Sequence, residues 1–174
     1  MVKRNLQKIT EDFETQVIDI ARVARVTAGG KRLSFRATVL VGKKKNYEIG
    51  LGIGKGRDVA LAIEKATREA KKNLIKIPII KNTIPHEVKA KYGAAEIILK
   101  PAKEGKGIIA GGVARTIFKL AGVPNVSSKM LGRTNNAINN AKAVLLAILK
   151  LKAPKEESKE TIKEKLEENK TEKI

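Results

Sequence analysis

The alternation of apolar and polar side chains in the first half of the chain constrains the fold more than any other feature. From Leu33 to Val41 every second residue is apolar, which predicts a strand with one apolar face and one polar face. Residues 17–27 and 47–54 alternate in the same way and predict a strand on either side. A pair of glycines and a lysine-rich turn separate the three segments, so antiparallel hairpins are expected.

An amphipathic helix is predicted directly after these strands. It begins near Arg57-Asp58, where an aspartate can cap free backbone amides. Its apolar side chains recur every three or four residues and form one stripe: Val59, Ile63, Ala66, Ala70 and Leu74. We expect this stripe to cover the apolar face of the sheet, to which the third strand contributes Tyr47, Ile49, Leu51 and Ile53. The opposite face of that strand is flat, so that another surface can approach closely, because it carries Gly50, Gly52 and Gly54.

The second half of the chain arranges strands and helices in a different order. Its predicted elements are two short strands, a helix, a strand and a last helix, at residues 88–92, 95–99, 113–121, 126–130 and 134–149. Gly122 and Pro124 end the first of these helices, and Thr134 or Asn135 caps the second. The apolar stripe of the last helix consists of Ile138, Ala141, Leu145, Ile148 and Leu149.

These elements predict an α+β protein, with a three-stranded antiparallel sheet and one helix followed by a β-β-α-β-α domain. The expected divisions are a polar N-terminal extension, a first domain, a connector, a second domain and a charged tail, at residues 1–15, 16–77, 78–85, 86–153 and 154–174. From Lys155 onward the tail holds six lysines and seven glutamates. This composition predicts disorder or a marginal solvated helix, and we assign the tail no function.

The charge of the chain indicates a polyanionic partner. Lysine and arginine number 37 against 18 aspartates and glutamates, which gives a formal net charge of +19. Nucleic acid is the usual partner of such a surface, and an anionic membrane is the second choice. Because aromatic residues make up only 3% of the chain, contacts to phosphates and to RNA shape are expected rather than base stacking.

Many of the cations fall in the first domain. A run such as Lys43-Lys44-Lys45 is by itself usually a solvated turn. Here the run shares a small domain with further basic residues, which favours RNA binding over that reading. The candidate RNA-binding cations are Arg22, Arg25, Lys31, Arg32, Arg36, Lys43, Lys44, Lys45, Lys55 and Arg57.

Catalytic and cofactor chemistry finds little support in the sequence. The chain has no cysteine and a single histidine, His86, so it can build neither a histidine-based triad nor a His/Cys zinc site. For Glu87 and Glu96, solvated ion pairs with nearby lysines are the default expectation. No apolar run approaches the roughly 20 residues needed to span a bilayer, and the N-terminus lacks the apolar core of a secretory signal. No cofactor, metal or small-molecule substrate is expected, and the location is a bacterial cytosol or an organelle matrix.

Two glycine-rich loops precede predicted helices. The first, GLGIGKGRD, departs from the G-x-G-x-x-G spacing of dinucleotide sites, so a structural role is favoured. The second, GKGIIAGG at residues 105–112, does not fit the Walker frame. It can form a backbone nest for an RNA phosphate or a partner's carboxylate, and a plain strand-to-helix crossover fits equally well.

Three segments together resemble a known family. They are RVARVTAGGKRLSFRATVLVG, GIGKGRDVALAIEKATREAKKNLI and PAKEGKGIIAGGVARTIFKLAGVPNVSSKMLGRTN, and the likeness covers residues 10–150. The chain resembles the bacterial-type fifth protein of the small ribosomal subunit. The resemblance implies two α/β domains, the first of which is similar to a double-stranded-RNA-binding domain. Residues 133–140 depart from the family pattern, and lysine outnumbers arginine, so single point charges are expected to replace some bidentate contacts.

The resemblance also implies a role. Family members bind small-subunit ribosomal RNA where the head meets the body, beside the fourth and eighth proteins and the path by which mRNA enters. With the fourth and twelfth proteins they influence decoding accuracy. The loop with Thr27, Gly29 and Gly30 corresponds to one that reaches RNA near the spectinomycin site. The residues expected at the contact with the fourth protein are Gly107, Gly111, Gly112 and Arg115.

Two alternatives stay open at this point. A free-standing RNA-binding regulator or chaperone with the same fold would share every electrostatic feature described above. An enzyme acting on RNA is disfavoured, because no constellation of general acid, general base or metal ligands is visible.

Overall fold

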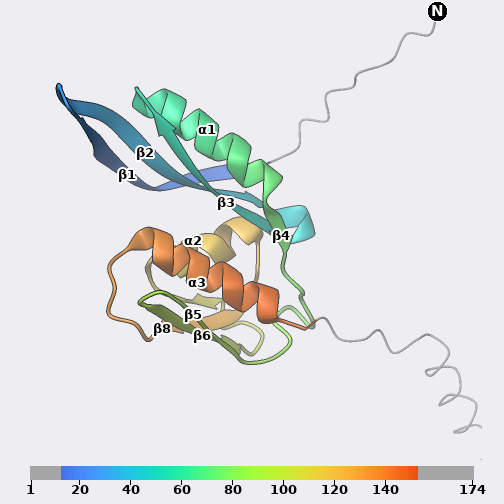
Figure 1. Cartoon of the computed structure of the whole chain (residues 1–174). Coiled ribbons are helices and arrows are strands. Elements are labelled where there is room, and N and C mark those ends of the chain that lie inside the picture. Colours follow the sequence, from blue (N-terminus) through green and yellow to red (C-terminus); the bar gives the residue numbers. More distant parts are fainter. Residues whose placement is uncertain (1–12, 153–174) are drawn as a thin grey trace, which may run out of the picture.

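The computed structural model describes residues 13–152, which form two α/β parts packed against each other (Figure 1). The first part is a four-stranded antiparallel sheet of order β1-β2-β3-β4 with helix α1 on one face. Its elements are β1 (Glu14–Thr27), β2 (Gly30–Lys43), a short 3-10 turn η1 (Lys44–Asn46), β3 (Glu48–Gly56), α1 (Val59–Lys72) and β4 (Leu74–Lys76).

The second part is a four-stranded sheet of order β5-β6-β8-β7 with two helices on one face. Only the β7–β8 pair is parallel. Its elements are β5 (Val88–Tyr92), β6 (Ala95–Pro101), β7 (Ile108–Ile109), α2 (Gly112–Ala121), β8 (Val126–Met130) and α3 (Ala137–Lys150). Helices α2 and α3 lie between this sheet and the first part (Figure 1).

Helix α1 packs on the face of β3 that carries Gly50, Gly52 and Gly54, and the backbones of the helix and the strand are in close contact. A Cβ atom placed on Gly52 would lie 1.9 Å from the carbonyl oxygen of Ala66, and one on Gly54 would lie 2.2 Å from that of Ala62. The helix residues buried there are all alanines: Ala62, Ala66 and Ala70. Small residues on both elements therefore bring α1 down onto the sheet. The predicted role of these glycines, to admit a second surface, is confirmed.

The prediction that α1 covers the apolar face of β3, which carries Ile49 and Leu51, is wrong. Side chains such as Ile49 point away from α1, and Ile49 and Leu40 are fully buried in a cluster with α2 residues such as Phe118. A Cβ atom on Gly42 would lie 2.5 Å from the carbonyl oxygen of Leu120, so α2 also approaches the sheet closely. The first sheet is covered on both faces. An apolar face alone does not say which of two helices covers it.

Several boundaries differ from the sequence prediction. Strand β1 begins at Glu14 rather than Val17 and carries a register shift between Val17 and Asp19. Helix α1 ends before Leu74, which starts β4, a short strand that the pattern did not reveal. Asp58 occupies the N-cap position of α1, but its side chain makes no capping bond.

In the second part, β5, β6, α2 and β8 lie where they were predicted. Strand β7 was missed, because two residues are too few to show a period. Helix α3 is capped by Asn136, not by Thr134 or Asn135. The Asn136 Oδ1 atom accepts hydrogen bonds from the amides of Ile138 (3.0 Å) and Asn139 (3.3 Å). Leu149, predicted in the apolar stripe, is 60% exposed. The tail from residue 154 lies outside the described residues.

Candidate nucleic-acid interface

The distal parts of β1 and β2 form a ribbon that extends beyond the rest of the sheet (Figure 1, blue). Strand β3 ends opposite Phe35, so residues 22–34, called the ribbon here, have no third strand beside them. At the tip, Gly30 adopts a φ of 136°, and the Thr27 hydroxyl donates to the carbonyl oxygen of Gly30 at 3.0 Å. The glycine is required there because other residues rarely adopt this backbone conformation.

Strand alternation divides the ribbon cations between its two faces. Arg25 lies directly opposite Arg32, on the face away from α1. Arg36 follows on β2, and its neighbour across the strands is Lys55 of β3. These four cations share one face, called the arginine face here. Arg22 and Lys31 lie on the other face, so the candidate cations of this domain do not form one continuous surface.

The arginine face is not neutralised by the protein itself. Within residues 13–152, the only carboxylate paired with it is that of Asp19, whose Oδ2 atom lies 3.7 Å from an Arg36 guanidinium nitrogen. Like charges directly opposite each other in a sheet are destabilising, as Arg25 and Arg32 are here. The arrangement therefore favours an external anion.

The opposite face of the hairpin exposes apolar side chains. Val26 is 73% exposed, Leu33 is 55% exposed and Ile20 is 45% exposed. A two-stranded ribbon without a packed face is only marginally stable in water. Its apolar side and its cations together indicate that the ribbon gains stability from a partner.

The lysine run at residues 43–45 lies at the other end of β2. Fourteen residues of extended strand separate the two turns by roughly 40 Å. The Lys43 ammonium lies 5.4 Å from the centre of the Phe13 ring, where Lys71 also approaches to 5.1 Å, and Lys44 forms an ion pair with Glu14. These contacts fix the position of Phe13 and Glu14, where β1 begins. Lys43, Lys44 and Lys45 therefore lie apart from the ribbon, and a role for them in RNA binding stays a prediction.

Arg57 lies at the same end of the sheet as the arginine face. It is exposed just before α1, and Lys55 precedes it on β3. The first turn of α1 contains no acidic residue and no side-chain cap. The positive end of the helix dipole lies in this region and is partly offset by the Asp58 carboxylate at the N-cap position.

The second glycine-rich loop is a crossover from β7 into α2. The Gly107 amide donates to Asn125 Oδ1 at 3.0 Å, and its carbonyl oxygen accepts from the Val126 amide at 3.2 Å. Asn125 is 6% exposed and also donates to the carbonyl oxygen of Asn82 at 3.2 Å. Sequence reasoning missed Asn125, because a single asparagine after a proline gives no signal of burial.

The outer side of this loop is open. Gly111 is the N-cap residue of α2, Gly112 has a φ of 48°, and both are exposed. A Cβ atom added at Gly107, Gly111 or Gly112 would meet nothing within 4 Å. Arg115 is exposed on the first turn of α2. Bare backbone and one arginine are thus available to a partner on this side.

Chemistry of other kinds is not supported in the part of the chain that the structure describes. Residues 13–152 contain no group of three metal-ligating side chains, and none of their helices is long and apolar enough to cross a membrane. Glu87 pairs with Lys100 at 3.3 Å on the surface, as expected for a solvated ion pair.

Comparison with known proteins identifies the family. A model of the N-terminal domain of ribosomal protein S5 matches residues 13–78, and a model of its C-terminal domain matches residues 90–161. The small ribosomal subunit protein uS5 of Thermotoga neapolitana is 48% identical over 149 residues, which cover 86% of this chain and 83% of the relative. The chain belongs to the ribosomal protein S5 family. The uS5c protein of Rhodomonas salina is 47% identical over 154 residues, with 86% and 90% covered.

A third relative extends the match along the chain. The uS5c protein of Trieres chinensis is 45% identical over 174 residues, covering 99% of this chain and 91% of its own. Membership in the S5 family confirms the resemblance and the α+β architecture inferred from the sequence. The chain is therefore a structural ribosomal protein and not an enzyme; it binds ribosomal RNA and takes part in translation.

Proposed function

We propose that the chain binds small-subunit ribosomal RNA through the ribbon, at the junction of head and body. The observation that carries this proposal is the Arg25–Arg32 pair. Two arginines face each other across the strands, and residues 13–152 supply no carboxylate within ion-pair distance of either. Opposite residues in an antiparallel pair lie about 5 Å apart, so one phosphate can bind between the two guanidinium groups.

The rest of the arginine face extends this site along β2. Arg36 and Lys55 form a second cationic pair, four residues from Arg32. Successive phosphates of one RNA strand can therefore follow the ribbon toward the body of the protein. Gly29 and Gly30 carry no side chain at the tip, so the backbone there can approach RNA closely, near the spectinomycin site.

The loop that precedes α2 serves a protein contact in this proposal. Gly111 and Gly112 offer open backbone, Gly107 leaves space beside them because it has no side chain, and Arg115 can pair with a carboxylate of the fourth small-subunit protein. An interface of a few kcal/mol is weak enough to open and close during decoding, which connects it to accuracy. A contact with the eighth protein and a place beside the path of incoming mRNA complete the proposed role. The setting is a bacterial cytosol or an organelle.

The test combines two measurements. Sucrose-gradient sedimentation of native lysate in high salt should show the chain with the small subunit in a one-to-one ratio. Recovery of the chain at the top of the gradient would instead favour a non-ribosomal RNA regulator. The affinity of the purified protein for a small-subunit RNA fragment should then be measured across salt concentrations.

The variants for the affinity measurement are Arg25→Ala combined with Arg32→Ala, and a matched pair on α1, Lys65→Ala with Lys72→Ala. Loss of two phosphate contacts lowers the slope of log affinity against log salt by about two. The α1 pair should leave the slope nearly unchanged, since both lysines lie on the far side of the sheet. An equal effect of both pairs would refute a localised site on the arginine face.

A further inference from the structure

The second sheet has an uncovered face whose side chains have no role so far. Alternation along β5, β6 and β8 sends Val88, Ala90, Ile97 and Leu99 toward α2 and α3, where all four are buried. The intervening side chains point the other way. They form what we call the lysine face: Lys89, Lys91, Glu96, Ile98, Lys100, Ser127 and Lys129.

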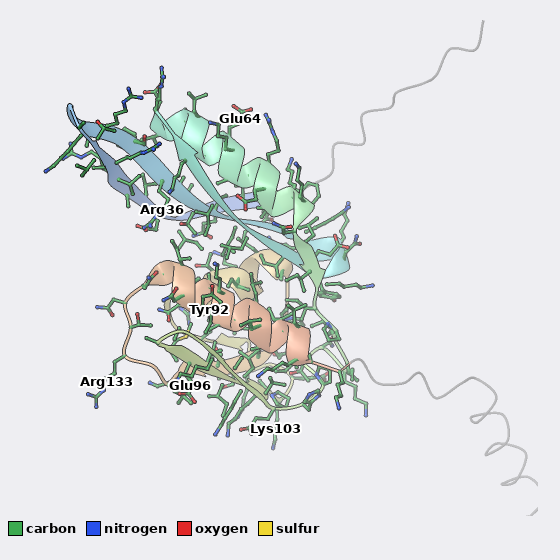
Figure 2. All side chains as sticks on the ribbon, viewed as in Figure 1. Arg36, Glu64, Tyr92, Glu96, Lys103 and Arg133 are labelled. Carbon is green, nitrogen blue, oxygen red and sulfur yellow. The ribbon has the colours of Figure 1, made fainter. Side chains whose placement is uncertain are left out.

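Figure 2 shows this division at the labelled residues. Tyr92 lies on the side of α3, and Glu96 lies on the opposite side of the sheet. The Tyr92 hydroxyl and ring contact Lys142 of α3, at 3.2 Å and 5.0 Å. None of the elements in residues 13–152 covers the lysine face, because both helices of the second part pack on the buried side.

The strand register fixes the pattern of charges. Lys89 lies opposite Ile98, and Ile98 lies opposite Lys129, so two lysines flank one isoleucine across three strands. Both lysines are exposed and, within the described residues, have no carboxylate at ion-pair distance. At the margins, Lys91 lies opposite Glu96, and Lys100 pairs with Glu87.

Apolar side chains at two edges complete this surface. Ile109 of β7 is the register partner of Ser127 and is 49% exposed. Leu131, whose amide donates to the Glu96 carbonyl oxygen at 2.8 Å, is 47% exposed. The lysine face therefore presents cations around a half-buried isoleucine, with further apolar contacts at its edges.

We propose that the lysine face binds an acidic protein surface in which carboxylates surround an apolar side chain. The proposal rests on the proposed function, because the partner would be a neighbour in the assembled subunit. Charge complementarity selects an acidic partner. A protein is favoured over RNA because a phosphate backbone offers no apolar contact to Ile98, Ile109 or Leu131, and because the Glu96 carboxylate would repel it. No aromatic ring on this face offers a base a stacking surface.

The experiment uses the full chain in purified small subunits. A carbodiimide, which joins ammonium groups to carboxylates in direct contact, should link Lys89 and Lys129 to acidic residues of one neighbouring protein. An amine-reactive reagent should modify both lysines about tenfold more slowly in the subunit than in the free protein. Lys65, exposed on α1, serves as the control lysine in the same digest.

A charge-reversed variant, Lys89→Glu with Lys129→Glu, should abolish the crosslinks and lower retention of the chain in salt-washed subunits about tenfold. Crosslinks of these lysines to RNA alone would overturn the choice of a protein partner. Equal modification in subunit and free protein would overturn the docking face itself. Absence of the chain from subunits would instead refute the proposed function, so the two failures are distinguishable.

Discussion

Replacement of Gly52 by alanine tests whether backbone contact between α1 and β3 holds the first part together. The new Cβ atom would lie 1.9 Å from the Ala66 carbonyl oxygen and 2.6 Å from the Ala70 amide nitrogen. Carbon atoms pack at about 3.5–4.0 Å from their neighbours, so the helix must move away by more than an ångström. Both contacting atoms belong to the helix backbone, so no side chain can rotate to make room.

The expected cost follows from this geometry. Overpacking of one methyl group in a core costs about 1–3 kcal/mol, and rigid backbone neighbours place this variant at the upper end. Alanine in place of glycine also stabilises the folded state by about 0.4–1 kcal/mol, because it restricts the unfolded chain. We therefore expect Gly52→Ala to lower the free energy of unfolding by about 2–3 kcal/mol. At about 2–4 °C per kcal/mol, the melting temperature should fall by roughly 4–12 °C.

The measurement is urea unfolding followed by circular dichroism, at a salt concentration that screens the positive charge. Gly29→Ala is the matched control, since a Cβ atom there meets nothing within 4 Å and the backbone needs no left-handed conformation. It should be neutral or slightly stabilising. If Gly52→Ala were as stable as Gly29→Ala, the close packing of α1 on β3 would not exist in solution.

Three further predictions concern single residues. Asn136→Ala should lower the free energy of unfolding by about 1 kcal/mol, because two amides of α3 lose their acceptor, whereas Asn135→Ala should change it little in the same urea titration. Gly30→Asp should impair subunit assembly or alter spectinomycin sensitivity more than Gly30→Ala does, since both strain the turn and only aspartate repels phosphate; equal ribosome profiles would contradict this. Arg115→Ala should shift stop-codon readthrough in a reporter at unchanged RNA affinity, and an unaltered reporter would count against the proposed protein contact.

The strands with clear alternation could be predicted from the sequence, because apolar and polar side chains follow each other with a period of two. Leu33 to Val41 form part of β2, and Val88 to Tyr92 form β5 as expected. The short strands could not be predicted, since β4 and β7 exist only through pairing with β3 and β8. Local pattern carries no information about pairing partners distant in sequence.

The faces of the first sheet show a second limit. Apolar residues on β3 indicated a core, but not which helix lies there. The decisive signal was the match between small residues on two elements: alternate glycines on β3 and alanines at every fourth position of α1. Arg22 and Arg25 lie on opposite faces of the sheet, and this could have been predicted because they are three residues apart on one strand, where side chains alternate. The register shift near Asp19 could not, because nothing in the local sequence marks it.

The two candidate binding surfaces lie at opposite ends of one continuous core. Leu40 and Ile49 of the first sheet share a hydrophobic cluster with Phe118 of α2 and Val144 of α3. The second sheet packs on the same cluster through Ile97. Displacement of one part against the other would therefore break buried apolar contacts. It would also break the close contact between Gly42 and the α2 backbone. Because protein interiors are close-packed, this shared core keeps the two parts in a fixed orientation relative to each other. An RNA strand held by the arginine face would thereby fix the orientation in which the lysine face and the loop before α2 meet their neighbours.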